Sequence, residues 1–485
     1  MEEKSNREHL KLATDFCDIV KSTLGPRGMN KIIVDEDTQN IILTNDGATI
    51  VGNIKGGNPI IEMFKNIAKS QELAVGDGTT TSLIITGELI KKAIELLDRG
   101  VHPTTIIEGY EIARRESIKF INSIKEEPDK LNLIKTSFGT KLPKQIIEIL
   151  SKLVLKIKKP KDLKIYKMEN YSSLEPELFK GYVFDGFTIN ERMKDEYEGR
   201  IAVLDFPINW KMDKFAVTKA EEMEKVQNLD SKFKQKIVDK LKKLNVGWIF
   251  YSDTTPEFEA YLTEQGITGV VVHRREDFDY ICKSINAVAS SNFDQINENN
   301  LGYGKVRYVK QRSGREGHIF IEGDTETLII KGETKQILEE IERAVLDVIS
   351  LLKLEDLSQV TGAGAVEIEI ANHLRNFSKQ VGGKVQIAIE KFADAIESIP
   401  ITLAENCGLD AIEILTFLRT IHLENKEKDA GIDAIKGISN ARERGIFEPA
   451  VIKIYAINSA TNLASLLIKT DNILAGTFNK KEKEE

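Results

Sequence analysis

The order of secondary structure along the chain is the feature that most restricts its fold. Up to about residue 130, and again from about residue 335, apolar residues recur at the three- and four-residue spacing of amphipathic helices. Between these ends, strand-like runs such as IAVLDF, VGWIFY and GVVVH alternate with helix-like segments, which is typical of an open α/β domain. The sequence therefore predicts an α+β multidomain protein in which the middle of the 485-residue chain is inserted into a helical domain.

Local patterns give more detail near the N-terminus. A helix is expected over 6–24, ending at Gly25-Pro26. The segments KIIV, NIILT and ATIV are expected to be short strands, with Asn45-Asp46-Gly47 in a turn. A further helix is predicted over 79–98, and a strongly amphipathic one over 219–244. Residues 385–408 are expected to be one more helix.

Composition excludes several classes of function. Lys and Arg total 68 against 76 Asp and Glu, and the net charge of −8 disfavours nucleic-acid binding. The three cysteines are far apart and form no CxxC, so we expect reduced thiols in a cytoplasmic protein. The polar N-terminus and the absence of a run of about 18 apolar residues predict no export and no membrane anchor. The tail NKKEKEE is expected to be a solvated charged segment.

The stretch VGDGTTT, residues 75–81, carries the first indication of chemistry. Backbone N–H groups at a helix N-terminus attract phosphate, and glycines let a ligand approach the main chain. Asp77 would repel a phosphate unless a divalent cation lay between them, which favours a Mg²⁺-nucleotide over bare phosphate. The same residues are typical of a helix N-cap, and this stretch alone does not decide between the two.

Two other loops are ambiguous when taken alone. Thr23-Leu24-Gly25-Pro26-Arg27-Gly28 is either a second phosphate-binding loop or a simple turn. Asp46 is either a turn residue or a catalytic acid. No P-loop, protein-kinase glycine loop, Rossmann fingerprint or zinc-ligand spacing is present, so the common nucleotide folds and a zinc site are poor matches.

Six motifs, taken together and in order, resemble those of group II chaperonins. They are TLGPRGMNK (23–31), TNDGATI (44–50), VGDGTTT (75–81), GAGAVEIE (362–369), LAENCGLD (403–410) and GIFEP (445–449). The resemblance implies a helical equatorial ATP-binding domain formed by both chain ends, a small intermediate hinge domain, and an inserted α/β apical domain with a helical lid protrusion. The implied segments are equatorial 1–130, intermediate 131–182, apical 183–325, intermediate 326–361 and equatorial 362–485.

The resemblance also implies residue roles at the matching positions. Asp77 would hold Mg²⁺, and Asp46 and Asp347 would be the catalytic acids that orient and activate the attacking water. The implied ATP-binding residues are Thr23, Leu24, Gly25, Pro26, Gly47, Gly78, Thr79, Thr80, Thr81, Gly362, Gly364, Gly431 and Glu448. One departure is Ala363, because the family usually has three successive glycines there.

The function implied is that of an ATP hydrolase coupled to protein folding. The chain would be one subunit of a double ring with eight paralogues per ring, binding non-native polypeptides in the cytoplasm and enclosing them by ATP-driven lid closure. IIEGYEIA (106–113) and IEKFADAIESIP (389–400) are most similar to the theta subunit of the eukaryotic cytosolic chaperonin, with the alpha subunit next. The alternative is a mainly structural ring subunit that binds nucleotide with slow or no hydrolysis. A small-molecule phosphotransferase is disfavoured because no acceptor site accompanies the glycine-aspartate loops.

Overall fold

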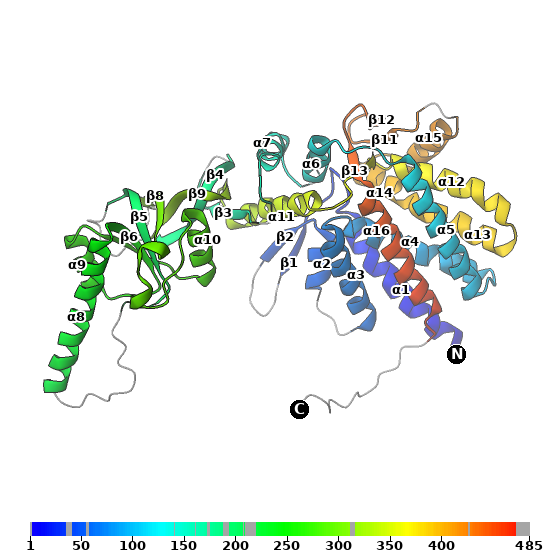
Figure 1. The fold of residues 1–485 in the computed structure, drawn as a ribbon. Helices are drawn as coiled ribbons and strands as arrows, with labels where there is room; N and C mark the ends of the chain where they lie inside the picture. The colour runs from blue at the N-terminus through cyan, green and yellow to red at the C-terminus, as the bar shows by residue number, and fades with distance from the viewer. Residues whose placement is uncertain are drawn as a thin grey trace. The chain divides into compact units, whose positions relative to one another are not determined.

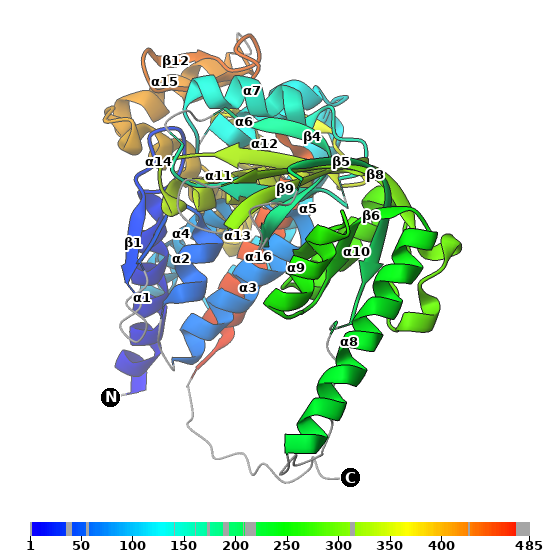
Figure 2. The ribbon, with the colours of Figure 1, turned by 90° about the vertical axis from the view of Figure 1, so that its left-hand side faces the viewer.

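The computed structural model describes residues 2–34, 41–54, 58–139, 141–160, 162–171, 175–187, 194–206, 208, 220–310, 316–424 and 427–471. The two chain ends, Met1–Leu155 and Thr334–Glu485, form one compact unit, and Lys156–Glu333 form a second (Figures 1 and 2). The predicted charged tail lies outside the described residues. Each unit is described below by itself.

The unit made by the chain ends is mainly helical. Its N-terminal elements are α1 (Glu2–Lys21), β1 (Lys31–Val34), β2 (Ile41–Thr44), α2 (Gly47–Asn53), α3 (Pro59–Val75), α4 (Thr79–Asp98), α5 (Pro103–Ile124), α6 (Lys130–Gly139) and α7 (Lys144–Val154). Its C-terminal elements are α11 (Lys335–Leu352), β10 (Gln359–Thr361), α12 (Ala365–Val381), α13 (Gly383–Ile396), α14 (Ser398–Asn406), α15 (Ala411–Leu423), β11 (Ala430–Asp433), β12 (Gly437–Asn440), β13 (Phe447–Pro449) and α16 (Ala450–Lys469). Three two-stranded antiparallel sheets pair β1 with β2, β10 with β13 and β11 with β12.

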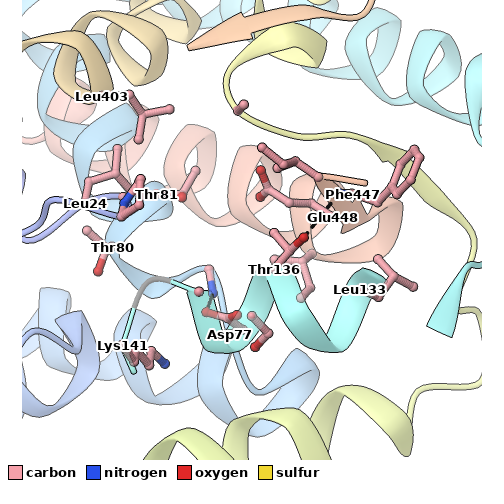
Figure 3. A pocket seen from close by; sticks show the side chains of 18 of the residues that line it. Leu24, Asp77, Thr80, Thr81, Leu133, Thr136, Lys141, Leu403, Phe447 and Glu448 are labelled. Carbon is pink, nitrogen blue, oxygen red and sulfur yellow. Dashed lines mark hydrogen bonds between the residues drawn. The ribbon is translucent and has the colours of Figure 1, made fainter. Parts of the chain in front are cut away.

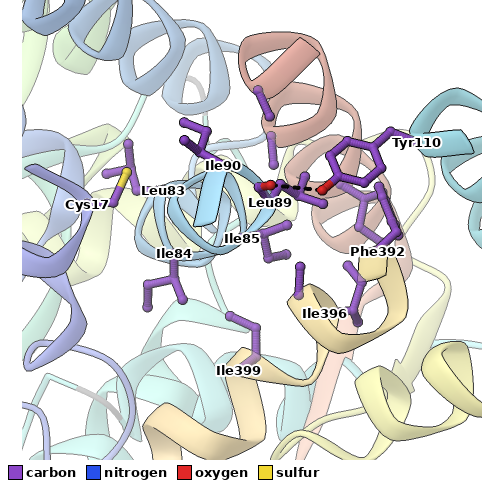
Figure 4. Close-up of a cluster of buried hydrophobic side chains, with 14 of the residues drawn as sticks. Cys17, Leu83, Ile84, Ile85, Leu89, Ile90, Tyr110, Phe392, Ile396 and Ile399 are labelled. Carbon is purple, nitrogen blue, oxygen red and sulfur yellow. Dashed lines mark hydrogen bonds between the residues drawn. The ribbon is translucent and has the colours of Figure 1, made fainter. Parts of the chain in front are cut away.

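One hydrophobic core joins the two chain ends of this unit. Its centre is α4, whose buried face packs against α1, α13 and α16. Figure 4 shows Tyr110 of α5 beside Phe392 of α13, with their ring centroids 5.6 Å apart, and the Tyr110 hydroxyl donates to the Leu89 carbonyl. Because α5 precedes the inserted unit and α13 follows it, folding of this core requires both ends of the chain.

Two predictions of secondary structure in this unit need correction, one of a strand and one of a helix. The segment ATIV is part of helix α2, because Asp46 caps the helix and Ile50 and Val51 turn into the core. Burial therefore overrides the strand preference of β-branched residues. The helix expected over 385–408 is divided at Glu397 into α13 and α14, with Pro400 in the first turn of α14.

Helix α16 corrects the expectation that no segment is apolar enough to cross a bilayer. By length and composition alone it passes that test. Its residues Ile457, Leu463 and Leu467 are buried in the core, and the helix packs against α4 and α5. A central position in the core accounts for its apolar character.

The second unit is built around a seven-stranded mixed sheet in the order β3-β9-β4-β7-β6-β5-β8. Its elements are β3 (Lys164–Met168), β4 (Glu177–Phe187), β5 (Glu196–Leu204), α8 (Ala220–Lys243), β6 (Val246–Tyr251), α9 (Pro256–Glu264), β7 (Thr268–Val271), α10 (Arg275–Ile285), β8 (Gly302–Lys310) and β9 (Glu316–Lys331), with short 3₁₀ turns at Phe293–Gln295 and Glu298–Asn300. Strands β5, β6 and β7 are parallel to one another, as alternating strands and helices require.

This sheet is not the open sheet that the sequence predicts. Strand β8 pairs with β5 and also with β9, from Val306 opposite Ile321 to Lys310 opposite Gly317, so six strands close on themselves. Strand β9 is 16 residues long and pairs with both β4 and β8. The register between β4 and β9 shifts at Lys180/Gly181. Closure leaves fewer unpaired edges than an open sheet would.

Helices pack on both faces of this closed sheet. Leu204 and Ile249 point toward α8 and α9, and the alternate residues Val203 and Phe250 point toward α10. In the amphipathic helix α8, Ile237, Val238 and Leu241 are fully buried in this layer. The side chains of the first half of α8 lie outside the described residues.

Candidate active site

A single cavity of about 380 Å³ in the helical unit collects most of the residues singled out by the sequence (Figure 3). Eleven of the predicted residues line it: Thr23, Leu24, Gly25, Pro26, Asp46, Asp77, Gly78, Thr79, Thr80, Thr81 and Glu448. The other predicted residues, Gly47, Gly362, Gly364, Gly431 and Asp347, are not among the lining residues, and each contacts one that is, except Gly364. The cavity thus joins segments up to about 420 residues apart in the chain.

The start of helix α4 forms one wall of the cavity. Gly78 is its N-cap, with a left-handed φ of 82° and no side-chain cap hydrogen bond. The carboxylate of Asp77 accepts from the N–H of Gly78 at 2.7 Å, and therefore does not cap the N–H groups of the first turn. The capping explanation for Asp77 and Thr79 does not hold. The helix presents free N–H groups and the positive end of its dipole to the cavity, which suits an anion.

The loop after α1 forms the adjoining wall. Gly25 has a φ of 84°, and a Cβ there would lie 2.4 Å from Cδ2 of Leu403, so both its conformation and its packing require glycine. The side-chain amide of Asn406 donates to the carbonyls of Lys21 and Leu24 at 2.9 and 2.8 Å. The loop is therefore held by a residue from the other end of the chain.

Asp46 lies at the beginning of α2 and lines the same cavity. Its Oδ2 accepts from the N–H and the hydroxyl of Thr49, at 2.8 and 2.7 Å. A Cβ on Gly47 would lie 2.6 Å from the hydroxyl of Thr80, so the start of α2 packs directly on the start of α4. This close approach brings the carboxylates of Asp46 and Asp77 to one cavity.

Asp347, on helix α11, reaches the cavity through a lysine. Its carboxylate is 22% exposed and forms an ion pair with Lys141, which lines the cavity. Burial raises the pKa of Asp347 to about 7, while Lys141 opposes the increase and the charges of Asp77 and Asp46 add to it. The pKa of Lys141 is also raised, because three carboxylates outweigh the cost of its burial. Sequence reasoning missed Lys141, since a single lysine in a loop has no distinguishing pattern.

Glu448 forms the far wall from strand β13. Gly362 supports it from the neighbouring strand end, because a Cβ on Gly362 would lie 2.9 Å from Oε1 of Glu448. Ala363 lines the cavity with a left-handed φ of 56°, and Gly431 packs against it, with a Cβ position 2.8 Å from the Ala363 carbonyl. Gly364 has a φ of 81° and begins α12. Ala363, which stands where the family usually has a glycine, is therefore part of the cavity wall.

Helix α6 covers one side of the cavity and was not predicted as part of the site. Its lining residues are Asn132, Leu133, Lys135, Thr136, Ser137 and Gly139. The hydroxyl of Thr136 accepts from the N–H of Phe447 at 3.3 Å, which ties α6 to the strand that carries Glu448. These residues belong to an ordinary amphipathic helix, so only the tertiary structure reveals their position.

The charges of the site define what it can bind. Asp46, Asp77 and Asp347 lie close to Lys141, so a polyanion beside these three carboxylates needs a cation that offsets the repulsion. Lys135, Lys453 and Arg444 also line the cavity. Among the described residues, no three His, Cys, Asp or Glu side chains form a metal site by themselves, so such an ion would take further ligands from phosphate and water. Uncapped N–H groups for phosphate and a carboxylate for a sugar hydroxyl fit a nucleotide. The fold and the site thus define a nucleotide-binding protein assembled from both chain ends.

Comparisons with known proteins identify the family. Residues 16–477 match the model of the TCP-1/cpn60 chaperonin family. Thermosome subunits of Pyrococcus horikoshii and Methanocaldococcus jannaschii are 33% and 34% identical, over 99% and 95% of this chain and 93% and 90% of theirs. The alpha and beta thermosome subunits of Archaeoglobus fulgidus are each 32% identical over 99% of this chain and 93% of theirs.

The chain belongs to the TCP-1/cpn60 chaperonin family. This membership confirms the predicted chaperonin fold class and the predicted function of an ATP-hydrolysing, protein-folding chaperonin subunit. The relatives named here are archaeal thermosome subunits. These comparisons therefore support membership of the family but not the more specific assignment to a eukaryotic theta subunit.

Proposed function

We propose that this chain is a subunit of a double-ring group II chaperonin in which the described cavity binds Mg²⁺-ATP and hydrolysis drives enclosure of a non-native polypeptide. The observation that carries the proposal is the convergence on one cavity of the uncapped start of α4, the loop after α1, and the carboxylates of Asp46 and Asp77, with Asp347 reaching the cavity through Lys141. No single one of these features would distinguish a nucleotide site from a capped helix or a turn.

The phosphates would lie against the start of α4. Their oxygens would accept from the N–H groups of Thr79, Thr80 and Thr81, and Gly78, which has no side chain, would let them approach the main chain. The loop of Thr23, Leu24, Gly25 and Pro26 would lie on the other side, with Gly47 keeping α2 close. Asp77 would be the protein ligand of Mg²⁺. When bound, the ion would offset the repulsion between this carboxylate and the phosphates.

Asp46 would orient the attacking water, and Asp347 would accept its proton. Asp347 can accept a proton only when it is ionised, and the raised pKa of about 7 makes it a stronger base than an ordinary aspartate. Lys141 would hold that carboxylate in place and bring a positive charge to the phosphate end of the cavity. Asp46, fixed by its two bonds to Thr49, would orient the water.

The sugar would lie at the other end, where Glu448 would accept from a ribose hydroxyl. Gly362, Gly364 and Gly431 would keep that wall free of bulk, and their positions around Ala363 and Glu448 support this role. The base would pass between this wall and α6, next to apolar residues such as Leu133 and Ile432.

The finer assignments belong to the same proposal. We propose eight paralogous subunits per ring, a cytoplasmic location, and non-native polypeptides rather than nucleic acid or membrane as partners. The segments 1–130 and 362–485 would be equatorial, 131–182 and 326–361 intermediate, and 183–325 apical with α8 in the lid. The occurrence of alpha and beta subunits in one relative organism supports a ring of paralogues. The theta-type assignment stays a prediction.

Two measurements test the proposal. Electron microscopy of the native particle should show stacked eightfold rings; a monomeric particle would contradict the ring. Single-turnover ATP hydrolysis by the assembled ring, with Asp347→Ala in this subunit alone, tests catalysis. A lower rate supports hydrolysis by this subunit, and an unchanged rate would favour the alternative of a mainly structural subunit that binds nucleotide.

A further inference from the structure

Three charged side chains form a cluster at the wall that carries Glu448. Lys453 of α16 lies with its Nζ 2.6 Å from Oε1 of Glu367 in α12 and 2.6 Å from Oε2 of Glu448. The side chains of Lys453 and Glu367 are 5% and 3% exposed, whereas that of Glu448 is 31% exposed. Lys453 and Glu367 are thus buried, and both Lys453 and Glu448 are among the residues that line the cavity.

The cluster fixes the orientation of the Glu448 carboxylate, because each of its two oxygens has a different neighbour. Its Oε2 is committed to Lys453, and its Oε1 is the atom that a Cβ on Gly362 would approach to 2.9 Å. A carboxylate can rotate about its last bond, so a strong partner on one oxygen sets the direction of the other. Lys453 therefore determines how Glu448 is presented at the cavity wall.

Electrostatics explain why the lysine needs a second carboxylate. Burial disfavours its charge, while Glu367 and Glu448 raise its pKa well above the ordinary value, so it stays an ammonium. Burial also raises the pKa of Glu448, and Lys453 opposes that increase. Lys453 is the hydrogen-bond partner of the Glu367 carboxylate through Oε1, whereas Oε2 of Glu367 has no hydrogen-bond partner among the described residues.

An ion pair that only joined α12 to α16 would be an expensive structural device. Buried ion pairs can often be replaced by apolar residues of similar size without loss of stability, and an unpaired carboxylate oxygen adds a further cost. What a structural role leaves unexplained is the shared third member, Glu448, which faces the cavity. Its presence links the cluster to the ligand.

We propose that Lys453, paired with both Glu367 and Glu448, is the positioning residue for Glu448 and that it sets the preference of the site for ribonucleotides over deoxyribonucleotides. This rests on the proposed function, in which Glu448 accepts from a ribose hydroxyl. A carboxylate held in one orientation keeps an acceptor at the hydroxyl. Without Lys453 the carboxylate of Glu448 would rotate or take up a proton, and the hydroxyl would lose that fixed partner.

The test compares nucleotide binding by calorimetry, using the full-length chain, Mg²⁺, and ADP, 2′-deoxy-ADP and 3′-deoxy-ADP. The wild type should bind ADP more tightly than at least one deoxy form. The variant Lys453→Met should bind ADP roughly tenfold more weakly, as expected for a lost hydrogen bond to a charged group, with little change for that deoxy form. The ratio of its affinities for ADP and for that deoxy form should therefore approach one.

Matched variants separate positioning from folding. Lys469→Met changes an exposed lysine of the same helix and should keep the preference. Glu367→Gln keeps the shape of its side chain and should reduce the preference in the same direction. If Lys453→Met does not fold, Glu367→Gln and Gly362→Ala, whose methyl group would press on Oε1 of Glu448, take its place.

The outcomes distinguish the two levels of inference. Equal weakening for ribose and deoxyribose forms in Lys453→Met or Glu367→Gln would mean a structural role only, and would overturn the positioning role. A wild type that binds all three nucleotides equally would also overturn it, while leaving nucleotide binding intact. A wild type that binds none of them would overturn the proposed function itself.

Discussion

At the scale of single residues, the site depends on side chains whose properties are set by neighbours far away in the chain. Asp347 is an ordinary helix residue by sequence, yet Lys141 and the carboxylates of Asp46 and Asp77 surround it in the folded protein. Ala363 is an ordinary alanine by composition, yet its backbone has a φ of 56°, which side-chain-bearing residues avoid. Both features lead to measurable expectations.

The pH dependence of hydrolysis should report Asp347. A base must be ionised to accept a proton, so activity is lost as pH falls below the pKa, which burial raises to about 7. We expect kcat/KM for ATP to rise roughly tenfold per pH unit and level off near pH 7. Asp347→Asn should be about 10²- to 10⁴-fold slower and lack this limb. A limb that persists in Asp347→Asn would assign it to another group.

Replacing Ala363 with glycine should stabilise the protein. Removal of the methyl group relieves the left-handed strain, for which we expect a gain of about 1 kcal/mol in the free energy of unfolding. Urea unfolding measures this. As a control, Ala371→Gly, at a buried position inside α12, should lose at least about 1 kcal/mol. A loss of stability in Ala363→Gly would show that the methyl packing outweighs the strain.

At the scale of elements, the site is a meeting of helix starts. Helices α2 and α4 begin side by side, and they differ in how their first N–H groups are satisfied. Asp46 caps α2 with its side chain, whereas Gly78 leaves α4 uncapped toward the cavity. The same kind of loop therefore supplies a capping carboxylate in one helix and a phosphate-binding end in the other.

Two substitutions at Asp46 should separate capping from catalysis. Asp46→Asn keeps an oxygen acceptor for the N–H of Thr49, so its stability should be close to that of the wild type. Asp46→Ala removes the cap and should cost about 1 kcal/mol. Both should hydrolyse ATP more slowly, because both lack the carboxylate. Normal hydrolysis by Asp46→Asn in a single-turnover assay would leave Asp46 only a capping role.

At the scale of the whole molecule, the chain has separate cores in its two units. The core around α4 is completed by residues from both chain ends, whereas the sheet core lies within Lys156–Glu333. A protein with this organisation can lose stability in one unit while the other keeps its structure.

Core substitutions should therefore act on one unit at a time. Phe392→Ala and Phe250→Ala each remove a fully buried ring, and each should cost about 3–5 kcal/mol. By scanning calorimetry, we expect Phe392→Ala to lower the transition that Mg²⁺-ADP raises, because the nucleotide stabilises only the unit that binds it. Phe250→Ala should lower a transition that the nucleotide does not move. Equal effects of both substitutions on one transition would contradict this independence.

Local sequence patterns predict those parts of the protein in which neighbouring residues set the structure. The periodicity of α1, α4 and α12 and the short apolar runs of β5, β6 and β7 identify these elements, because a helix on a core buries one face and a strand covered on both faces is apolar along its length. The resemblance of the short motifs to those of chaperonins pointed to eleven residues that line one cavity, although no one of these motifs decides the function when taken alone.

Other features depend on contacts between residues that are far apart in the chain. Helix α2 forms where the sequence predicts a strand, β8 closes the sheet onto β9, and α6 lies along the cavity, because burial and long-range pairing outweigh local preference. Lys141 and Lys453 become part of the site through contacts with residues 206 and 86 positions away. Ion pairs of that kind depend on distances in space, and a linear sequence does not contain them.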